Sequence, residues 1–299
     1  MINIDETYTI FDDKLRGRKP KFKLQKNNQM YIYKYGSVNN EIWAELIAEQ
    51  LGLQAGIKMA HYQLAKYKDT IGVITDYFLK STELIISSDK LKEATQLILV
   101  ENNIDTNLKK NTILNIVQAA SIYDNEIDTE ELTTELMKRW VFYGIIMESD
   151  KNATNLGFIK GENGISLTPD YDNSSMAGLN KNIQNNIDSL RRGQTIYHYT
   201  DNIKNHLQIT EKDTGYFIGD FKNFVEKYPI IAKQCMESFD NINVEEAMEN
   251  VEIINDTQIP WNIKYWVSKT VNSRLNDMKN IYDKTKSNVK VKIDSSSDN

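Results

Sequence analysis

The sequence predicts an α+β protein with two lobes, a small β-rich N-terminal lobe and a larger, mainly helical C-terminal lobe. Two observations carry this prediction. Before residue 78, β-forming residues alternate with polar ones, whereas long patterns of helical period dominate afterwards. The chain has 299 residues, enough to bury a sizeable core. We therefore expect an N-lobe over residues 1–78 and a C-lobe over residues 79–299.

The N-lobe should be a small sheet that carries one helix. Residues 4–35 predict strands and turns, and further strands are predicted around 61–66 and 71–78. Between them, apolar residues at helical spacing predict a helix over 41–51, and Gly52 ends it.

Helices dominate the predicted C-lobe. Their periodic patterns cover residues 91–100, 113–124, 129–148, 219–239 and 261–284. A short β-like run over 156–167 interrupts them. The end of the chain is Lys-rich and then Ser- and Asp-rich, which predicts a disordered tail over 285–299.

Composition excludes several classes of site. The single cysteine, Cys235, excludes an internal disulfide and thiolate metal clusters, and three histidines are too few for a multi-histidine metal centre. The N-terminus is acidic where a signal peptide is basic, and the longest apolar run, 140–147, is too short to span a membrane. We expect a cytoplasmic protein without a membrane partner.

The charge is unevenly distributed. The formal net charge is −6, yet seven cations and no acid lie between Lys14 and Lys26. A chain that is acidic elsewhere is a poor direct binder of nucleic acid, but a local basic segment can hold one anion such as a phosphate. The alternative for this segment is a solvated basic turn.

A second motif follows the predicted helix 129–148. Asp150 and Asn155 are separated by four residues, the interval of the kinase catalytic loop D-x-x-x-x-N. There the carboxylate orients a substrate hydroxyl, and the amide oxygen ligates Mg²⁺. The alternative is an ordinary loop after a helix, closed by an Asx-turn.

Asp170 and Asp172 follow a strand-like run and are candidate hard oxygen ligands for Mg²⁺. On an extended backbone both would face the same way, so the spacing does not choose between them. A polar turn after Pro169 is the alternative interpretation.

Lys34 lies on the apolar face of a predicted strand, which is unusual for a lysine whose ammonium has no partner. Glu41, in the first turn of the next helix, is the expected partner, as in the Lys–Glu pair of kinases. An edge-strand lysine that reaches solvent is the alternative. The end of the last strand, 74–78, offers backbone groups to an adenine edge.

Taken in order, these motifs resemble the HipA-like serine/threonine kinases, and in length the short, CtkA-like members. The most specific are E-x9-L-G-L from Glu41 and D-x-N-x-x-N-x-G-F from Asp150. The resemblance covers about residues 10–178 and rests on the segments 31–35, 41–53, 73–78, 143–158 and 169–174.

The resemblance implies a two-lobed protein-kinase-like fold and a set of site residues. It makes Asp150 the catalytic aspartate, chooses Asp172 over Asp170, and places the phosphate loop in the basic segment 14–21. Implied nucleotide contacts are Lys34, its partner Glu41, the linker residues Asp76, Tyr77 and Phe78, and the loop residues Arg16, Gly17 and Arg18. The implied Mg²⁺ ligands are Asn155 and Asp172.

The chain departs from the family pattern in the catalytic loop and the phosphate loop. Asn152 stands in the catalytic set where the family usually has a histidine, and a neutral amide carries no charge onto the phosphoryl group. Lys151 and Thr154 are the neighbours that could substitute for it. The phosphate loop has one glycine and no hydroxyl, so side-chain cations would hold the phosphate there.

The sequence thus predicts ATP- and Mg²⁺-dependent transfer of the γ-phosphoryl group to Ser or Thr of a protein, in a toxin-like or signalling role. The resemblance implies a protein substrate and a small DNA-binding antitoxin as partners. Two alternatives stay open: a pseudokinase that binds nucleotide or a partner protein without transfer, and a lipid or small-molecule kinase on the same fold.

Overall fold

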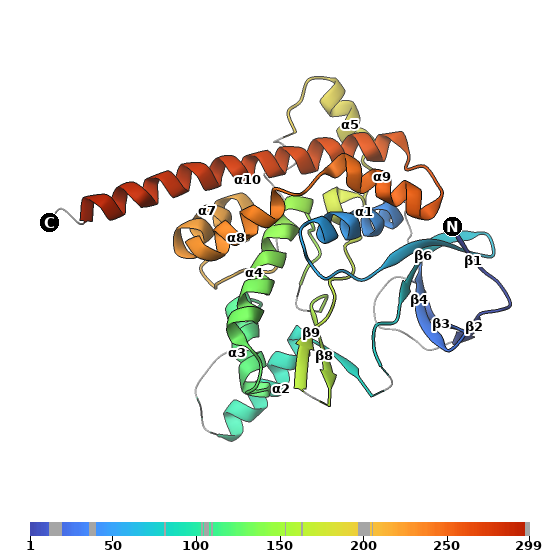
Figure 1. Cartoon of the computed structure of the whole chain (residues 1–299), viewed down its shortest axis with the longest axis horizontal. Coiled ribbons are helices and arrows are strands. Elements are labelled where there is room, and N and C mark those ends of the chain that lie inside the picture. Colours follow the sequence, from blue (N-terminus) through green and yellow to red (C-terminus); the bar gives the residue numbers. More distant parts are fainter. Residues whose placement is uncertain are drawn as a thin grey trace.

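The computed structural model of the chain is mixed α and β, as the sequence predicts (Figure 1). It describes residues 1–11, 20–35, 40–80, 82–102, 104, 108, 110–152, 154–162, 164–196, 204 and 206–296, with side chains up to residue 287. Within these residues, no helix is long and apolar enough to cross a bilayer.

A six-stranded sheet forms the N-terminal part, in the order β1-β5-β6-β4-β3-β2. All pairs are antiparallel except β1 with β5. The β3–β4 hairpin turns at Asn27 and Asn28, which both have positive φ, as a tight hairpin requires. The strands are β1 (Ile2–Ile4), β2 (Thr9–Phe11), β3 (Lys21–Lys26), β4 (Gln29–Lys34), β5 (Tyr62–Tyr67) and β6 (Thr70–Asp76).

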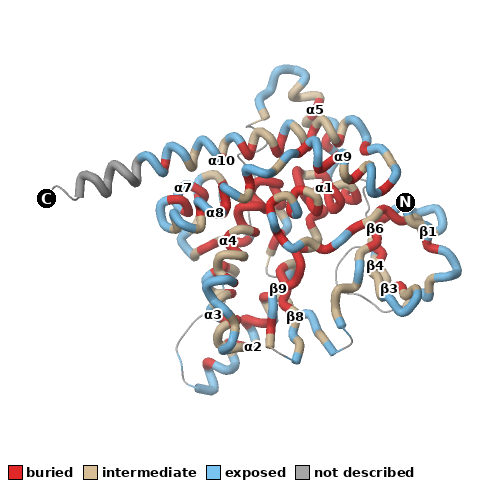
Figure 2. The backbone as a smooth tube through the Cα atoms, in the orientation of Figure 1, coloured by how far each residue is buried: buried red, intermediate tan, exposed pale blue. Residues whose placement is uncertain are grey.

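Helix α1 (Asn40–Gln54) is buried along most of its length and belongs to the main hydrophobic core. It packs against β5 and against α9 (Val244–Asn255), a helix that the sequence patterns miss. Figure 2 shows the buried residues concentrated along α1 and α4 (Thr129–Ile146). The sheet and α1 all lie within residues 1–78, but α1 shares its core with the C-terminal helices, so the division at residue 78 stays a prediction.

The C-terminal part is mainly helical, with a three-stranded sheet in the order β7-β8-β9. Its strands are β7 (Leu84–Ser87), β8 (Gly157–Gly161) and β9 (Gly164–Leu167). Its other helices are α2 (Ser88–Glu101), α3 (Ile113–Tyr123), the 3-10 helix η1 (Met176–Gly178), α5 (Gln184–Arg191), α7 (Phe217–Lys227), α8 (Pro229–Phe239) and α10 (Trp261–Ser296).

One helix prediction needs correction. The predicted helix 219–239 is two helices, because Pro229 cannot donate its backbone N–H to a continuing helix and instead begins α8. Helix α10 runs from Trp261 to Ser296 (Figure 1), and the predicted disordered tail over 285–299 stays a prediction.

Candidate active site

Three charged side chains meet where β4, α1 and the segment after β9 come together. Lys34, the last residue of β4, donates hydrogen bonds to Glu45 Oε1 and, at 2.5 Å, to Asp172 Oδ1. Glu45 is fully buried, whereas the Asp172 side chain is 30% exposed. We call these three residues the Lys34 cluster.

Electrostatics keeps the Lys34 ammonium charged. Burial alone disfavours the ammonium, but the Glu45 and Asp172 carboxylates outweigh this and hold the pKa of Lys34 well above its ordinary value. The cluster therefore holds a charged ammonium beside a carboxylate that solvent can reach. The ammonium can contact a phosphate, and the carboxylate can contact a divalent cation.

The predicted pairing of Lys34 with Glu41 is wrong: Glu45, one helical turn further along α1, is the partner. Helix α1 begins at Asn40, so Glu41 lies at its very start, while the next turn faces Lys34. Glu45 also accepts a hydrogen bond from the Asn173 backbone N–H at 2.9 Å, which links α1 to the residue after Asp172. Glu41 is buried in the first turn.

The expectation that Asp170 and Asp172 face the same way is also wrong. Asp172 has a positive φ of 60°, so the backbone is not extended there. Its N–H donates to the Tyr62 hydroxyl at 3.2 Å. Asp170 points instead into the interior, where it accepts hydrogen bonds from Tyr143, Lys151 and Asn173. The turn at Asp172 thus sends two nearby carboxylates into different environments.

Asp170 and its partners form a second group, the Asp170 cluster, made of Asp170, Lys151, Tyr143 and Asn173. The side chains of Asp170 and Lys151 are each 1% exposed, with Lys151 Nζ 3.2 Å from Asp170 Oδ1. Burial raises the pKa of Asp170, but Lys151, the nearby Arg139 and the hydrogen bonds outweigh it, so the pKa lies below its ordinary value. Lys151 points away from the loop surface and does not substitute for a charge at position 152.

Glu148 anchors the start of the predicted catalytic loop. Helix α4 ends at Ile146, and Met147 follows it in the left-handed conformation. The buried Glu148 then accepts hydrogen bonds from the Asp150 backbone N–H and from the backbone N–H and hydroxyl of Ser175. Burial raises the pKa of Glu148 to about 7. This one carboxyl group ties the loop to the chain that follows Asp172.

The loop itself closes through its amides. Asn155 Nδ2 donates to the Asp150 carbonyl at 2.8 Å, so the two residues of the D-x4-N motif are held together. Asn152 Oδ1 accepts from the Thr154 N–H at 2.9 Å and from its hydroxyl, which is the Asx-turn of the alternative interpretation. The Asx-turn is therefore present, the catalytic role of the loop stays a prediction, and Asp150 is exposed.

The segment predicted to contact adenine continues the sheet. The Tyr77 N–H donates to the Met30 carbonyl at 2.9 Å, so this donor is already engaged. The centroid of the Phe78 ring lies 6.1 Å from that of Tyr171. In the sequence, Tyr171 lies between Asp170 and Asp172, the two candidate Mg²⁺ ligands. Asp76 is the last residue of β6 and pairs with Tyr31. The predicted phosphate-loop residues Arg16, Gly17 and Arg18 lie outside the described residues.

The sequence missed Glu45, Asn173 and Ser175. A signal for Glu45 was present, because Glu41, Glu45 and Glu49 repeat every four residues and so share one face of the helix. No comparable pattern marks Asn173 or Ser175, whose backbone and side-chain hydrogen bonds join segments that only the fold brings together.

The side-chain oxygens of Asp172 and Asn155 are of the type that binds Mg²⁺ in nucleotide-binding sites. Within the described residues, no group of three or more His, Cys, Asp or Glu side chains could hold a metal alone. Magnesium bound with phosphates needs only one or two carboxylates from the protein. The exposed part of Asp172 and the amide oxygen of Asn155 are the candidates.

The family model of the HipA-like C-terminal domain matches residues 14–247. The chain belongs to this family. No curated protein sequence matches it. Among solved structures, the Helicobacter pylori proinflammatory kinase CtkA has a TM-score of 0.69 at 17% identity, over 95% of this chain and 97% of that one. The HipA chain of a Shewanella oneidensis MR-1 complex with HipB and operator DNA has a TM-score of 0.55 at 12% identity, over 90% and 67%.

These likenesses show that the HipA-like chain has the fold of the CtkA kinase. They confirm the predicted family and the predicted α+β kinase-like fold.

Proposed function

We propose that this HipA-like protein transfers the γ-phosphoryl group of ATP, bound with Mg²⁺, to a Ser or Thr hydroxyl of a protein. The observation that carries the proposal is the Lys34 cluster, in which one ammonium contacts a buried glutamate on α1 and a partly exposed aspartate from another segment. Kinases use this Lys–Glu–Asp arrangement to position phosphates and magnesium.

Each residue has a role in this proposal. Lys34 neutralises phosphate charge, and Glu45 keeps its ammonium charged and oriented. Asp172 and Asn155 supply oxygen ligands to Mg²⁺, whose chemistry is to neutralise the charge that develops on the phosphates. Asp150 orients the acceptor hydroxyl and takes its proton as the new P–O bond forms and the bond to ADP breaks.

A pseudokinase is the second candidate, and the catalytic loop favours it. In the described part of the loop, Lys151 is buried against Asp170 and Asn152 is engaged by Thr154. Neither places positive charge beside Asp150. Such a protein would bind nucleotide through the Lys34 cluster without transferring phosphate.

The partners belong to the same proposal. The Shewanella HipA structure holds HipB and operator DNA. By analogy, we propose a small DNA-binding antitoxin as a cytoplasmic partner of this chain, beside its protein substrate.

Incubation with γ-labelled ATP and Mg²⁺ tests the proposal, with Asp150→Asn and Asp172→Asn variants and the exposed turn variant Asp69→Asn as the control. We expect label on Ser or Thr of a protein, lost in both site variants and retained in the control. Nucleotide binding without transfer to any protein would support the pseudokinase. Label in the lipid or small-molecule fraction would support a kinase for such acceptors.

A further inference from the structure

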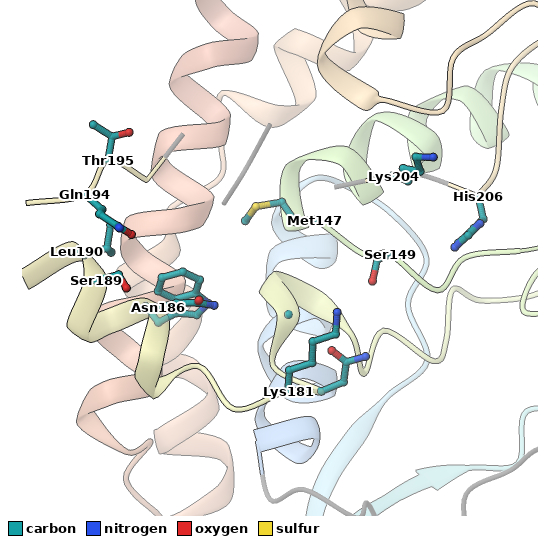
Figure 3. Close-up of a pocket in the computed structure, with 13 residues that line it drawn as sticks. Met147, Ser149, Lys181, Asn186, Ser189, Leu190, Gln194, Thr195, Lys204 and His206 are labelled. Carbon is teal, nitrogen blue, oxygen red and sulfur yellow. The ribbon is translucent and has the colours of Figure 1, made fainter. Parts of the chain in front are cut away.

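A groove begins beside the catalytic loop and runs along α5 and α10. Its first part, about 800 Å³, is lined by Met147 and Ser149 at the end of α4 and by α5 on the opposite side (Figure 3). A second hollow of about 430 Å³ shares Leu190 and Gln194 with the first and continues along α10. Ser149 directly precedes Asp150, so one end of the groove lies next to the proposed proton acceptor.

The lining of the groove differs from the rest of the protein in charge. Lys181, Lys204, His206 and Lys269 contribute to it, and no described lining residue is acidic. The whole chain has a net charge of −6, so this surface is a local exception. In Figure 3 the Lys181 ammonium points into the space between α5 and Ser149. An anionic ligand would be attracted there.

The remaining lining suits a peptide backbone. It is rich in amides and hydroxyls, including Asn186, Ser189 and Gln194. The Asn180 side-chain oxygen is buried in the wall and accepts no hydrogen bond from the described residues. Side-chain amides both donate and accept, as an extended peptide requires, and an unsatisfied buried acceptor gains from a ligand N–H.

Rigid supports hold the groove against the catalytic loop. Trp266 of α10 is fully buried at its floor and donates from Nε1 to the Ala177 carbonyl at 2.8 Å. The Ser149 N–H donates to Ser175 Oγ at 3.2 Å, and Ser175 is bound in turn by Glu148. The position of the groove relative to Asp150 is therefore set by the same contacts that shape the loop.

We propose that this groove binds an acidic, extended segment of the protein substrate and directs its Ser or Thr toward Asp150. The delivery of a hydroxyl rests on the proposed kinase function, whereas binding of an acidic segment does not. Lys181 and Lys204 supply the charge selection, and the amides hold the backbone.

Fluorescence anisotropy tests the binding step without phosphotransfer. The probes are labelled peptides of equal length that carry Glu, Gln or Lys at the same positions around one Ser. We expect the Glu peptide to bind tightest, and the Lys181→Gln/Lys204→Gln variant to weaken it roughly tenfold, since two partly exposed ion pairs are lost. The control Lys222→Gln, on the exposed face of α7 outside the groove, should bind like the wild type.

The outcomes separate the two proposals. Equal binding of the three peptides, no binding of any of them, or unchanged binding in the double variant would overturn the groove assignment, even if the protein phosphorylates other substrates. Selective binding of the Glu peptide that the double variant weakens would support the groove, even if no phosphate is transferred and the kinase proposal fails. In an active enzyme, the double variant should raise the KM for the Glu peptide and leave the KM for ATP unchanged.

Discussion

The aspartates of the Lys34 cluster and of the Asp170 cluster lie on either side of Tyr171 in the sequence. Each cluster joins one lysine to an aspartate, and both lie against the main core. In the Asp170 cluster both charged side chains are 1% exposed, and Tyr143 and Asn173 occupy further sites on the carboxylate. In the Lys34 cluster the Asp172 side chain is 30% exposed.

This difference separates a structural ion pair from a candidate binding site. A carboxylate whose oxygens are all engaged by protein groups in a dry interior cannot accept a metal or phosphate without breaking the core. A carboxylate that solvent reaches can exchange water for a ligand at little cost. The following predictions test whether the two clusters divide structure and activity in this way.

The largest expected effect is on stability, in the Asp170 cluster. Lys151→Met removes the buried cation and leaves Asp170 without its ion-pair partner, so the free energy of unfolding should fall by about 3 to 5 kcal/mol. Urea denaturation measures this. The matched control is Lys90→Met, which breaks the exposed Lys90–Glu93 pair and should cost less than about 1 kcal/mol. Equal losses in the two variants would contradict a structural role for the Asp170 cluster.

Asp172→Asn should affect activity much more than stability. Removal of this proposed Mg²⁺ ligand should lower kcat for the proposed phosphotransfer by about 100- to 1000-fold, because metal coordination is worth several kcal/mol in such reactions. The melting temperature should change far less than in Lys151→Met, because Asp172 is partly exposed. A variant that unfolds as readily as Lys151→Met would show that both clusters are structural.

Glu148 is a buried carboxyl group outside both clusters, and it predicts a pH dependence. Because its pKa is raised to about 7 in the folded protein, the folded state binds more protons than the unfolded state between pH 4.5 and 7. The unfolding free energy should therefore fall as pH rises through this window, by about 3 kcal/mol at most.

Glu148→Gln should remove this slope, because the variant carries no titratable group there. Urea denaturation at several pH values measures it, and the exposed variant Glu126→Gln should keep the slope of the wild type. Identical slopes in wild type and Glu148→Gln would assign the pH dependence to other groups.

The smallest effect distinguishes Glu45 from Glu41 in helix α1. Glu45→Gln removes one of the two carboxylates that contact Lys34 and leaves Asp172 as its partner. The value of kcat/KM for ATP should therefore fall about tenfold, which is typical when a group that orients a ligand-binding side chain is lost. Glu41→Gln should change it by less than about twofold. Steady-state kinetics of both variants would reveal the reverse order if Glu41 were the working partner after all.

Much of this site follows from local patterns. The D-x4-N spacing and the strand lysine are local features, and the structure forms a closed loop from the first and places the second beside a glutamate and an aspartate. The choice of Glu41 failed because sequence gives the face of a helix but not which turn of it lies opposite a strand end. The left-handed backbone conformation of Asp172 could not be predicted from the sequence either, because no residue in Pro169–Asn173 requires it.

The sequence by itself determined the α+β class, the family and most of the chemical groups at the site, because periodicity and motif spacing are properties of neighbouring residues. Only the tertiary structure decided that Glu45 contacts Lys34, that Lys151 is buried against Asp170, and that a cationic groove adjoins the predicted catalytic loop. Lys34 and Glu45 are only 11 residues apart, and Lys151 and Asp170 only 19, but contacts with segments more than a hundred residues away set their orientation, such as Lys34 with Asp172 and Asn173 with Glu45. Packing and burial set such contacts, and no local pattern encodes them.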